Sequence, residues 1–182
     1  MSQVPTDIDS NLNQHISYLC SFSLGQNNGQ NHCAHFVSHV MGYEFAGPTC
    51  KNFTWDDKQK AEAGATIRVD DIFKRSQQTG LLEDKSAAMT ECLIFVTLAS
   101  NVSKVGGSLV MGNHPRKHIG ILSHGKVWNY SNTGNKVVAD TLEEAIGLSH
   151  SIIVVKDGAI QQRFDCQPGA KPTLFDLLHY MI

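Results

Sequence analysis

The fold depends on the stretch NHCAHFVSHVMG, residues 31–42. Its apolar residues recur at helical spacing: Phe36, Val37, Val40 and Met41. With Gly42 as a stop signal, the stretch predicts one short amphipathic helix whose first turn contains Cys33. Unpaired N–H groups and the positive end of the helix dipole favour an anion there, and therefore a thiolate over a thiol. Cys33 is a candidate nucleophile, and the alternative is a small buried residue that packs in the core.

Length and composition are those of one ordinary globular domain. The 182 residues, 41% hydrophobic and 18% charged, suffice for a single catalytic domain with a sizeable core, residues 1–182. A net charge of −2 provides no basic surface for nucleic acid or an anionic membrane. No apolar run approaches the roughly 20 residues of a membrane span. Residues 1–10 have neither a basic start nor an apolar core, so we expect synthesis in the cytoplasm without a secretory signal peptide.

The cysteines follow no metal-binding or disulfide pattern. They are Cys20, Cys33, Cys50, Cys92 and Cys166. Their number is odd and no C-x-x-C pair occurs, so the sequence indicates neither a disulfide framework nor a structural zinc knuckle. A single bridge, such as one between Cys20 and Cys50, stays open, and at least one thiol is expected to be free in a monomer.

Helical patterns come first along the chain, and strand-like patterns follow. Residues 8–19 predict a first helix, residues 46–65 a long covering loop, and Asp70 the cap of a helix that stops near Gly80. Short β-branched and apolar runs then predict strands at 92–98, 108–111, 119–122, 126–130, 136–138 and 152–155. Asp140 and Glu143 form a capping box for a short helix. Helices followed by a mostly antiparallel sheet indicate an α+β fold.

A cysteine nucleophile needs a base, and the base needs an orienting group. Among the nine histidines, His118 begins a predicted strand, and Asn129 lies on its hairpin partner. Cross-strand neighbours can touch, so Asn129 could fix the tautomer of the His118 ring. A helix terminus packed against this hairpin would bring Cys33 to His118. Gly120 would leave space beside the site, and the backbone N–H of Cys33 would be an oxyanion donor.

At these residues the chain resembles a known family. It is similar to the papain-like cell-wall amidases and peptidases, namely the NlpC-type enzymes and the CHAP domains. The similar segments are, in order, Cys33-Ala34-His35-Phe36-Val37, His118-Ile119-Gly120-Ile121 and Asn129. NlpC-type enzymes usually read D-C-S-G-F around the cysteine, so the looser CHAP pattern fits this chain better. The resemblance covers residues 31–130.

The resemblance implies a papain-like fold, with N-terminal helices and the nucleophile-bearing helix packed on an antiparallel sheet. It implies hydrolysis of amide bonds in peptidoglycan stem peptides by Cys33, His118 and Asn129, with no cofactor and no metal. A small domain of this kind resembles phage endolysins and the amidase effectors that bacteria inject into rivals. Such a protein acts on the cell wall, in the periplasm of a target cell if delivered, and an effector has an immunity protein as its inhibitor.

Two other classes of function stay open. His35 and His39 lie four residues apart on the predicted helix, a spacing that can hold zinc, and His32 is close by. His114 and His118 could complete the site of a zinc-binding hydrolase. The last class is a non-enzymatic binding domain.

In a binding domain of this fold, the aromatic residues Phe53, Trp55 and Trp128 could line a groove, although the pattern favours a core position for any one of them. Arg116 or Lys117, just before His118, could meet a substrate carboxylate, and a solvated basic turn is the alternative.

Overall fold

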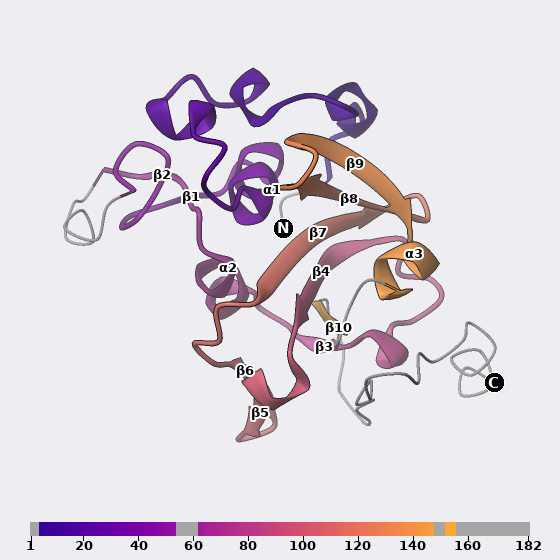
Figure 1. Ribbon diagram of the computed structural model, residues 1–182. Helices are drawn as coiled ribbons and strands as arrows, with labels where there is room; N and C mark the ends of the chain where they lie inside the picture. Colours follow the sequence, from indigo (N-terminus) through magenta and orange to yellow (C-terminus); the bar gives the residue numbers. More distant parts are fainter. Residues whose placement is uncertain (1–3, 54–61, 148–151, 156–182) are drawn as a thin grey trace.

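A six-stranded antiparallel sheet runs through the protein (Figure 1). The computed structural model describes residues 4–53, 62–147 and 152–155. The strand order is β3 (Gly80–Leu81), β10 (Ile152–Val155), β4 (Glu91–Thr97), β7 (Lys117–Ser123), β8 (Lys126–Ser131) and β9 (Lys136–Thr141). The predicted α+β class is therefore confirmed, and so is the predicted hairpin of β7 and β8. That hairpin turns through His124 and Gly125, whose φ angles of 50° and 78° suit a tight two-residue turn.

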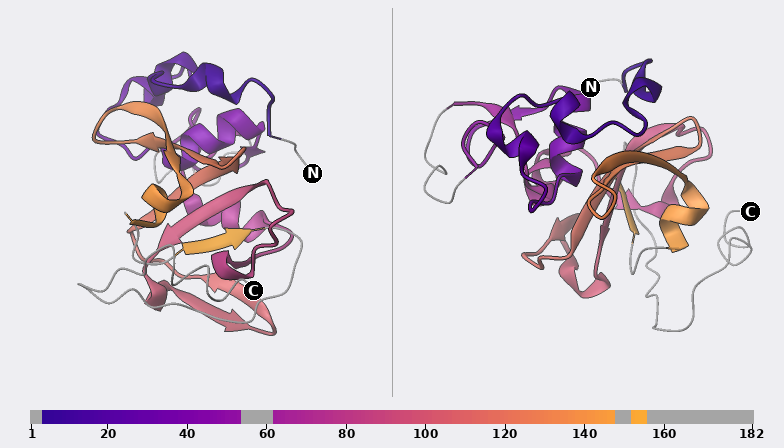
Figure 2. Two further views of the ribbon diagram at one scale, coloured as in Figure 1. Left: turned by 90° about the vertical axis from the view of Figure 1, so that its right-hand side faces the viewer. Right: turned by 45° about the horizontal axis from the view of Figure 1, so that its top comes forward.

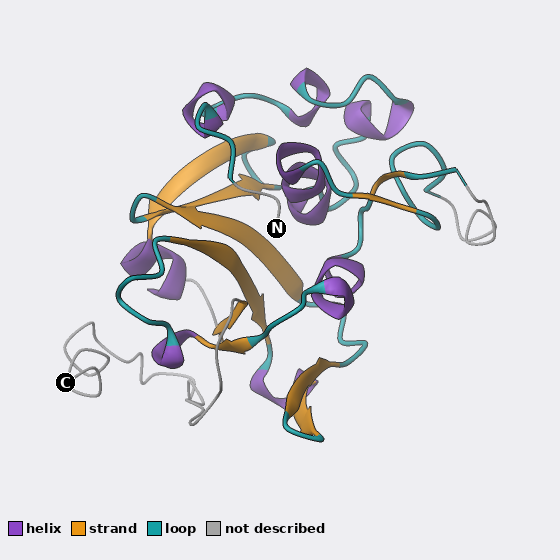
Figure 3. Ribbon diagram, turned by 180° about the vertical axis from the view of Figure 1, so that it is seen from behind, coloured by secondary structure: helices purple, strands orange, loops and turns teal. Residues whose placement is uncertain are grey.

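The helices cover both faces of the sheet. Those in the described residues are α1 (Cys33–Met41), α2 (Val69–Arg75) and α3 (Leu142–Gly147). In Figures 1 and 3, α1 and α2 lie on one side of the sheet and α3 on the other. The predicted Cys33 helix is confirmed, and it ends where Gly42 takes a φ of 64° and closes a left-handed cap. None of the helices described is long and apolar enough to cross a membrane.

Alternation along β7 and β8 builds one core on each face of the sheet. The larger core, against α1, includes four side chains of these strands that are no more than 3% exposed: Ile119, Ile121, Trp128 and Tyr130. Leu122 and Val127 belong to the smaller core, which Leu142 and Ala145 of α3 cover. The central hairpin is thus buried on both sides, which holds the ends of its strands in place.

The helix predicted over residues 8–19 is wrong. The N-terminal segment forms short 3-10 turns instead: η1 (Ile8–Asn11), η2 (Ile16–Tyr18) and η3 (Ser23–Gln26). Asn13, with a φ of 62°, interrupts the helical pattern. Its N–H donates to the carbonyl oxygen of Val137 in β9, and the N–H of Val137 donates to Gln14. Pairing with the edge strand replaces helical hydrogen bonds, and the segment lies across α1 (Figure 2). The N-terminal half therefore contains only α1 and α2 as α-helices among its described residues.

Two small hairpins stand outside the main sheet. One pairs β1 (Glu44–Phe45) with β2 (Gly64–Ala65), so both ends of the predicted covering loop are anchored. Residues 54–61 of that loop, including Trp55, lie outside the described part of the chain. The other hairpin pairs β5 (Val102–Val105) with β6 (Ser108–Met111) and projects away from α1 (Figure 1). Short 3-10 turns η5 (Leu82–Asp84) and η6 (Ala99–Asn101) flank β4.

The two predicted helix caps are wrong in detail. α2 begins at Val69, so Asp70 lies inside its first turn. At α3 the capping box is made by Thr141 and Glu144. The Glu144 N–H donates to Thr141 Oγ1 at 3.2 Å, and the Thr141 N–H donates to Glu144 Oε2 at 2.8 Å. Asp140 is therefore not a cap: it is a residue of β9, and its carboxylate is available for another contact.

Candidate active site

Three residues that the sequence predicts as a site lie together. Cys33 is the first residue of α1, His118 the second of β7, and Asn129 lies in β8. The Nε2 atom of His118 is 3.1 Å from Oδ1 of Asn129, and the side chain of Cys33 makes a hydrogen bond with the same ring. Since Nε2 faces the amide oxygen, Nδ1 is the nitrogen left for the sulfur. A donor to Asn129 fixes the proton of the neutral ring on Nε2.

The charge of His118 is governed by these neighbours. Burial disfavours the imidazolium, but three groups favour it: Cys33 by charge and hydrogen bond, Asn129 by hydrogen bond, and Asp140 by charge. Together they raise the pKa of His118 to about 9. The ring is therefore positively charged at neutral pH. A charged ring in this position has a proton to donate, which is what nucleophilic catalysis by a cysteine would require of it.

Gly120 allows the close approach of β8 to β7. A Cβ atom at Gly120 would come within 2.8 Å of a Val127 methyl group, 3.0 Å of the Trp128 carbonyl oxygen and 3.3 Å of the Asn129 Cβ. Contacts this short are not tolerated, so any larger residue would push Asn129 away from His118. The predicted role of Gly120 is thereby corrected: it permits contact between the two strands and does not leave an open space.

Asp140 is a fourth member of the site that the sequence analysis missed. Its Oδ2 atom accepts a hydrogen bond of 2.8 Å from Nδ2 of Asn129. Asn129 is therefore held at both ends, with its oxygen toward His118 and its amide nitrogen toward the carboxylate. Asp140 lies opposite Val127 in the β8–β9 register, so it is a diagonal neighbour of Asn129 on the same face. A prediction that continued the strand of residues 136–138 to residue 140 would have placed Asp140 beside Asn129.

The N-terminus of α1 is closed by two asparagines. The N–H of Cys33 donates to Oδ1 of Asn31 at 3.0 Å, and the same oxygen accepts from Nδ2 of Asn132 at 3.0 Å. The N–H of His32 donates to Oδ1 of Asn132 at 2.9 Å. The Cys33 N–H that was expected to serve as an oxyanion donor is thus already bound. Cys33 is also only 1% exposed.

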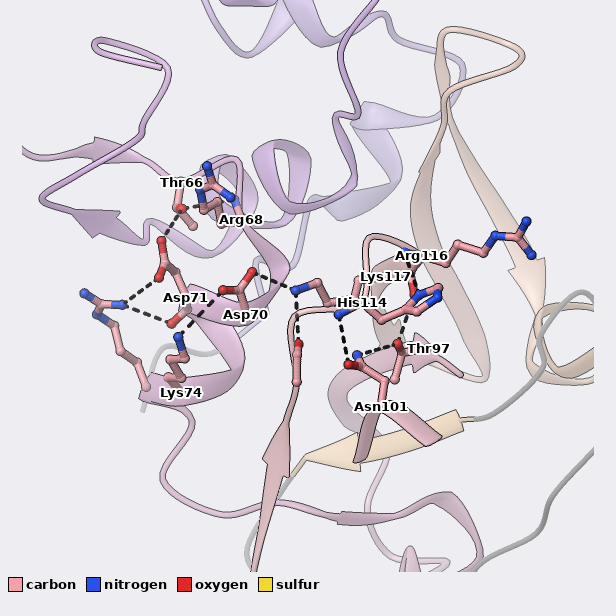
Figure 4. A network of polar contacts seen from close by, with 12 residues as sticks. Thr66, Arg68, Asp70, Asp71, Lys74, Thr97, Asn101, His114, Arg116 and Lys117 are labelled. Carbon is pink, nitrogen blue, oxygen red and sulfur yellow. Dashed lines mark hydrogen bonds and ion pairs between the residues drawn. The ribbon is translucent and has the colours of Figure 1, made fainter. Parts of the chain in front are cut away.

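Lys117, directly before His118, ties the start of β7 to α2 (Figure 4). Lys117 Nζ lies 3.1 Å from Oδ1 of Asp70 in α2 and donates to the Gly112 carbonyl oxygen. Burial alone would raise the pKa of Asp70, but the hydrogen bond and charge of Lys117 lower it below its usual value. Lys117 therefore anchors the start of β7, and it is not free to meet a substrate carboxylate. Arg116 is exposed.

The groove that Phe53, Trp55 and Trp128 were expected to line in a binding domain does not include Trp128. Trp128 is 3% exposed and belongs to the larger core. Phe53 packs on a separate cluster formed by Cys20, Leu24, Cys50 and Ala65. Trp55 lies outside the described residues, so this alternative loses the contribution of Trp128.

A second cluster surrounds the two helical histidines. His35 and His39 lie with Cys20 and Cys50, and the four potential ligand atoms are within 4.8 Å of one another. For a zinc hydrolase, the sequence analysis expected His114 and His118 to complete the site. Instead, His118 contacts Cys33 and Asn129, and His114 contacts the backbone of Arg116. The hydrogen bond from Cys50 is the main reason that the pKa of Cys20 falls to about 7.

The described cysteines Cys20, Cys33, Cys50 and Cys92 are all buried and form no disulfide with one another; Cys166 lies outside the described residues.

Comparisons of this chain with protein-family models, with curated proteins and with solved structures found no match. An assignment of function therefore depends on the two side-chain clusters themselves.

Proposed function

We propose that this protein is a cysteine hydrolase of the papain-like type that cleaves amide bonds in peptidoglycan stem peptides. The observation that carries the proposal is the contact of Cys33 with a His118 ring whose other nitrogen faces Asn129. A nucleophile, a base and a group that orients the base are the parts that covalent hydrolysis requires. A cysteine at a helix N-terminus, packed against an antiparallel sheet that bears the histidine, also agrees with a papain-like arrangement.

The substrate class rests on the resemblance to the cell-wall amidases and peptidases. Its motifs are the residues that meet in the cluster: Cys33 begins the first motif, His118 begins the second, and Asn129 follows on the next strand. Cys33 and His118 lie 85 positions apart in the sequence (118 − 33 = 85). The resemblance therefore concerns the order of the motifs along the chain as well as their contact. Stem peptides offer the amide carbonyl groups on which such a thiolate acts.

In the proposed reaction the Cys33 thiolate attacks an amide carbonyl carbon. A C–S bond forms while the carbonyl π electrons move to oxygen. The C–N bond then breaks, and the leaving nitrogen takes the proton of the His118 imidazolium. The neutral ring next accepts a proton from water as that water attacks the thioester. Breaking the C–S bond releases the carboxylic acid and restores the thiolate and the imidazolium.

Access to the sulfur requires a local opening. Cys33 is 1% exposed and its N–H is bound to Asn31, so productive substrate binding requires both that the sulfur becomes exposed and that this hydrogen bond is released. Asn31 is itself exposed, so its side chain can turn toward solvent once it loses the hydrogen bond from Asn132. The freed Cys33 N–H then becomes the donor that stabilises the oxyanion.

Replacing Asn129 by alanine is expected to lower kcat/KM by about ten- to a hundredfold, the scale of a lost orienting contact. Asn129 orients the His118 ring without itself receiving or giving the proton. The ring keeps its hydrogen bond to Cys33, so catalysis weakens but persists. Initial rates on soluble stem-peptide fragments measure the effect. A rate equal to wild type would remove Asn129 from the site and leave a dyad.

The pH profile is expected to show an alkaline limb near pH 9. A raised pKa means that the His118 imidazolium persists to about pH 9 and is lost above it, together with the proton for the leaving amine. Asp140→Asn keeps a partner for Asn129 but removes a charge that favours the imidazolium, so its limb should move to lower pH. Profiles of kcat/KM for both proteins test this. An unmoved limb would mean that Asp140 only packs the site.

Purified sacculi separate an enzyme from a binding domain. Dye-labelled sacculi are incubated with wild-type protein or with Cys33→Ala, then sedimented, and label and protein are measured in both fractions. The hydrolase releases label into the supernatant, whereas Cys33→Ala does not. Sedimentation of both proteins with no released label would instead favour the binding domain.

A further inference from the structure

Four potential metal ligands come together from three separate segments. Cys20 follows η2, His35 and His39 lie on successive turns of α1, and Cys50 lies in the loop between β1 and β2. Cys20, His35 and Cys50 are 1%, 0% and 3% exposed, and His39 is half-buried. Two cysteines and two histidines, with the histidines four residues apart on one helix, are a frequent ligand set for structural zinc.

The spacing of the four ligand atoms suits a tetrahedral ion. Zn–S bonds of about 2.3 Å and Zn–N bonds of about 2.0 Å place the ligand atoms about 3.3 to 3.8 Å apart. In this protein all four lie within 4.8 Å of one another, and Nε2 of His35 is 3.1 Å from Nε2 of His39. Small side-chain rotations are therefore enough to close the tetrahedron around one ion.

A hydrogen-bond chain behind His35 assigns its free nitrogen. The Asn27 carbonyl oxygen can only accept, so the His32 ring carries its proton on Nε2 and donates at 2.9 Å. The unprotonated Nδ1 of His32 then accepts from Nδ1 of His35 at 3.1 Å. The lone pair of His35 is consequently on Nε2, the atom that faces His39 and the cysteines. Such an outer partner is what fixes the tautomer of a metal-binding histidine.

The surroundings favour an ion with no net charge in its complex. Leu24 and Ala65 belong to the same buried cluster as the two cysteines, with Phe53 and Ile67 packed against it. A divalent ion bound by two thiolates and two neutral imidazoles is electrically neutral, so it can be buried among these residues at little cost. Two thiolates and two imidazoles in tetrahedral positions select zinc over harder ions such as magnesium.

We propose that the protein binds one structural zinc ion through Cys20, His35, His39 and Cys50. Four protein ligands leave no open position for a water molecule, so the ion does not take part in hydrolysis. It joins the N-terminal 3-10 segment and the β1–β2 loop to α1. Their described residues form short 3-10 turns and isolated turns rather than a long helix or strand, so a shared ion gives them a fixed place next to the helix that carries Cys33.

Metal content of the full chain tests the proposal. The protein is purified in reducing buffer with any affinity tag removed, and metals are measured by inductively coupled plasma mass spectrometry. We expect about one zinc ion per chain, and a fall in Tm of about 10 °C after removal by a strong chelator. Cobalt(II) added to the metal-free protein should give the thiolate charge-transfer and tetrahedral d–d absorption bands.

Matched variants assign the ligands. His39→Ala and Cys50→Ser should lose the zinc, and their Tm should no longer respond to chelator. His124→Asn is the control, because His124 is an exposed histidine in a positive-φ turn that asparagine tolerates, and it should keep the ion. Cys33→Ala should also keep it, which separates this site from the proposed catalysis.

Three outcomes would overturn the proposal. One is wild-type protein that holds no metal and shows no cobalt spectrum. The second is full zinc content in both ligand variants. The third is a Cys20–Cys50 disulfide that persists after purification under reductant, as found by mass spectrometry of peptides. Since the wild-type measurements do not depend on any variant, a failure of Cys50→Ser to fold leaves the proposal testable.

Discussion

Cys33→Ala is expected to lower kcat/KM for amide hydrolysis by about ten-thousandfold or more, the loss of activity that follows when an enzyme's covalent nucleophile is removed. Cys33 is the one thiol among the residues that act on His118, the others being Asn129 and Asp140. Cys33 is 1% exposed and lies in the larger core, so the variant also loses some packing, about 1 kcal/mol for one deleted sulfur atom. Initial rates and thermal unfolding, measured on the same preparations, separate the two effects.

Cys92→Ala is the matched control for this variant. It also removes a buried thiol, but from the smaller core, four residues along β4 from Val96, the residue that pairs with His118. A comparable loss of stability with nearly full activity is expected. If Cys33→Ala hydrolysed substrate at the wild-type rate, Cys33 would be a packing residue and the proposed mechanism would have no nucleophile.

His118→Ala is expected to have the second largest effect, a loss of about a thousandfold or more. The variant loses both the proton donor for the leaving amine and the base that activates water. It also loses the positive partner of the sulfur, so alkylation of Cys33 by iodoacetamide should slow near neutral pH. Hydrolysis rates and peptide-resolved alkylation rates provide independent measures of these losses.

His114→Ala is the control for His118→Ala. His114 lies four residues earlier and contacts the Arg116 N–H and Asn101, outside the Cys33 cluster (Figure 4). Its hydrolysis and Cys33 alkylation should stay near wild type. An equal loss in both variants would point to a disturbed start of β7 and would argue against a chemical role of His118.

Patterns that extend over one element were predictable from the sequence. The Cys33 helix follows from apolar spacing and from Gly42, which does take a left-handed φ. The β7–β8 hairpin follows from two apolar runs around a short polar turn. Once the helix and the hairpin are predicted, few ways remain to pack the helix on that strand pair. The contact of Cys33, His118 and Asn129 follows from one of them.

Features that depend on contacts between distant segments were not predictable. Asp140 fits a helix cap as well as a strand end, and only the register with β8 shows that it meets Asn129. The expected first helix fails because Asn13 pairs with β9, a partner 124 positions later at Val137 (137 − 13 = 124). Local spacing holds no information about either contact.

The proposed zinc ligands show the same division. His35 and His39 share a helix, so their i, i+4 spacing already made them candidate metal ligands. Cys20 and Cys50 lie 15 residues before His35 and 11 residues after His39, on segments without a regular repeat (35 − 20 = 15; 50 − 39 = 11). Only the folded chain brings these thiols to the histidines, so sequence spacing pointed to the wrong partners.

The most direct test of the central claim is mass spectrometry of the soluble fragments released from purified peptidoglycan by wild-type protein and by Cys33→Ala. The wild-type digest should contain fragments in which one amide bond has become a carboxylate and a free amine, with the gain of one water. The Cys33→Ala digest should lack them. Identical digests from the two proteins, or fragments cut only at glycosidic bonds, would contradict a cysteine amidase.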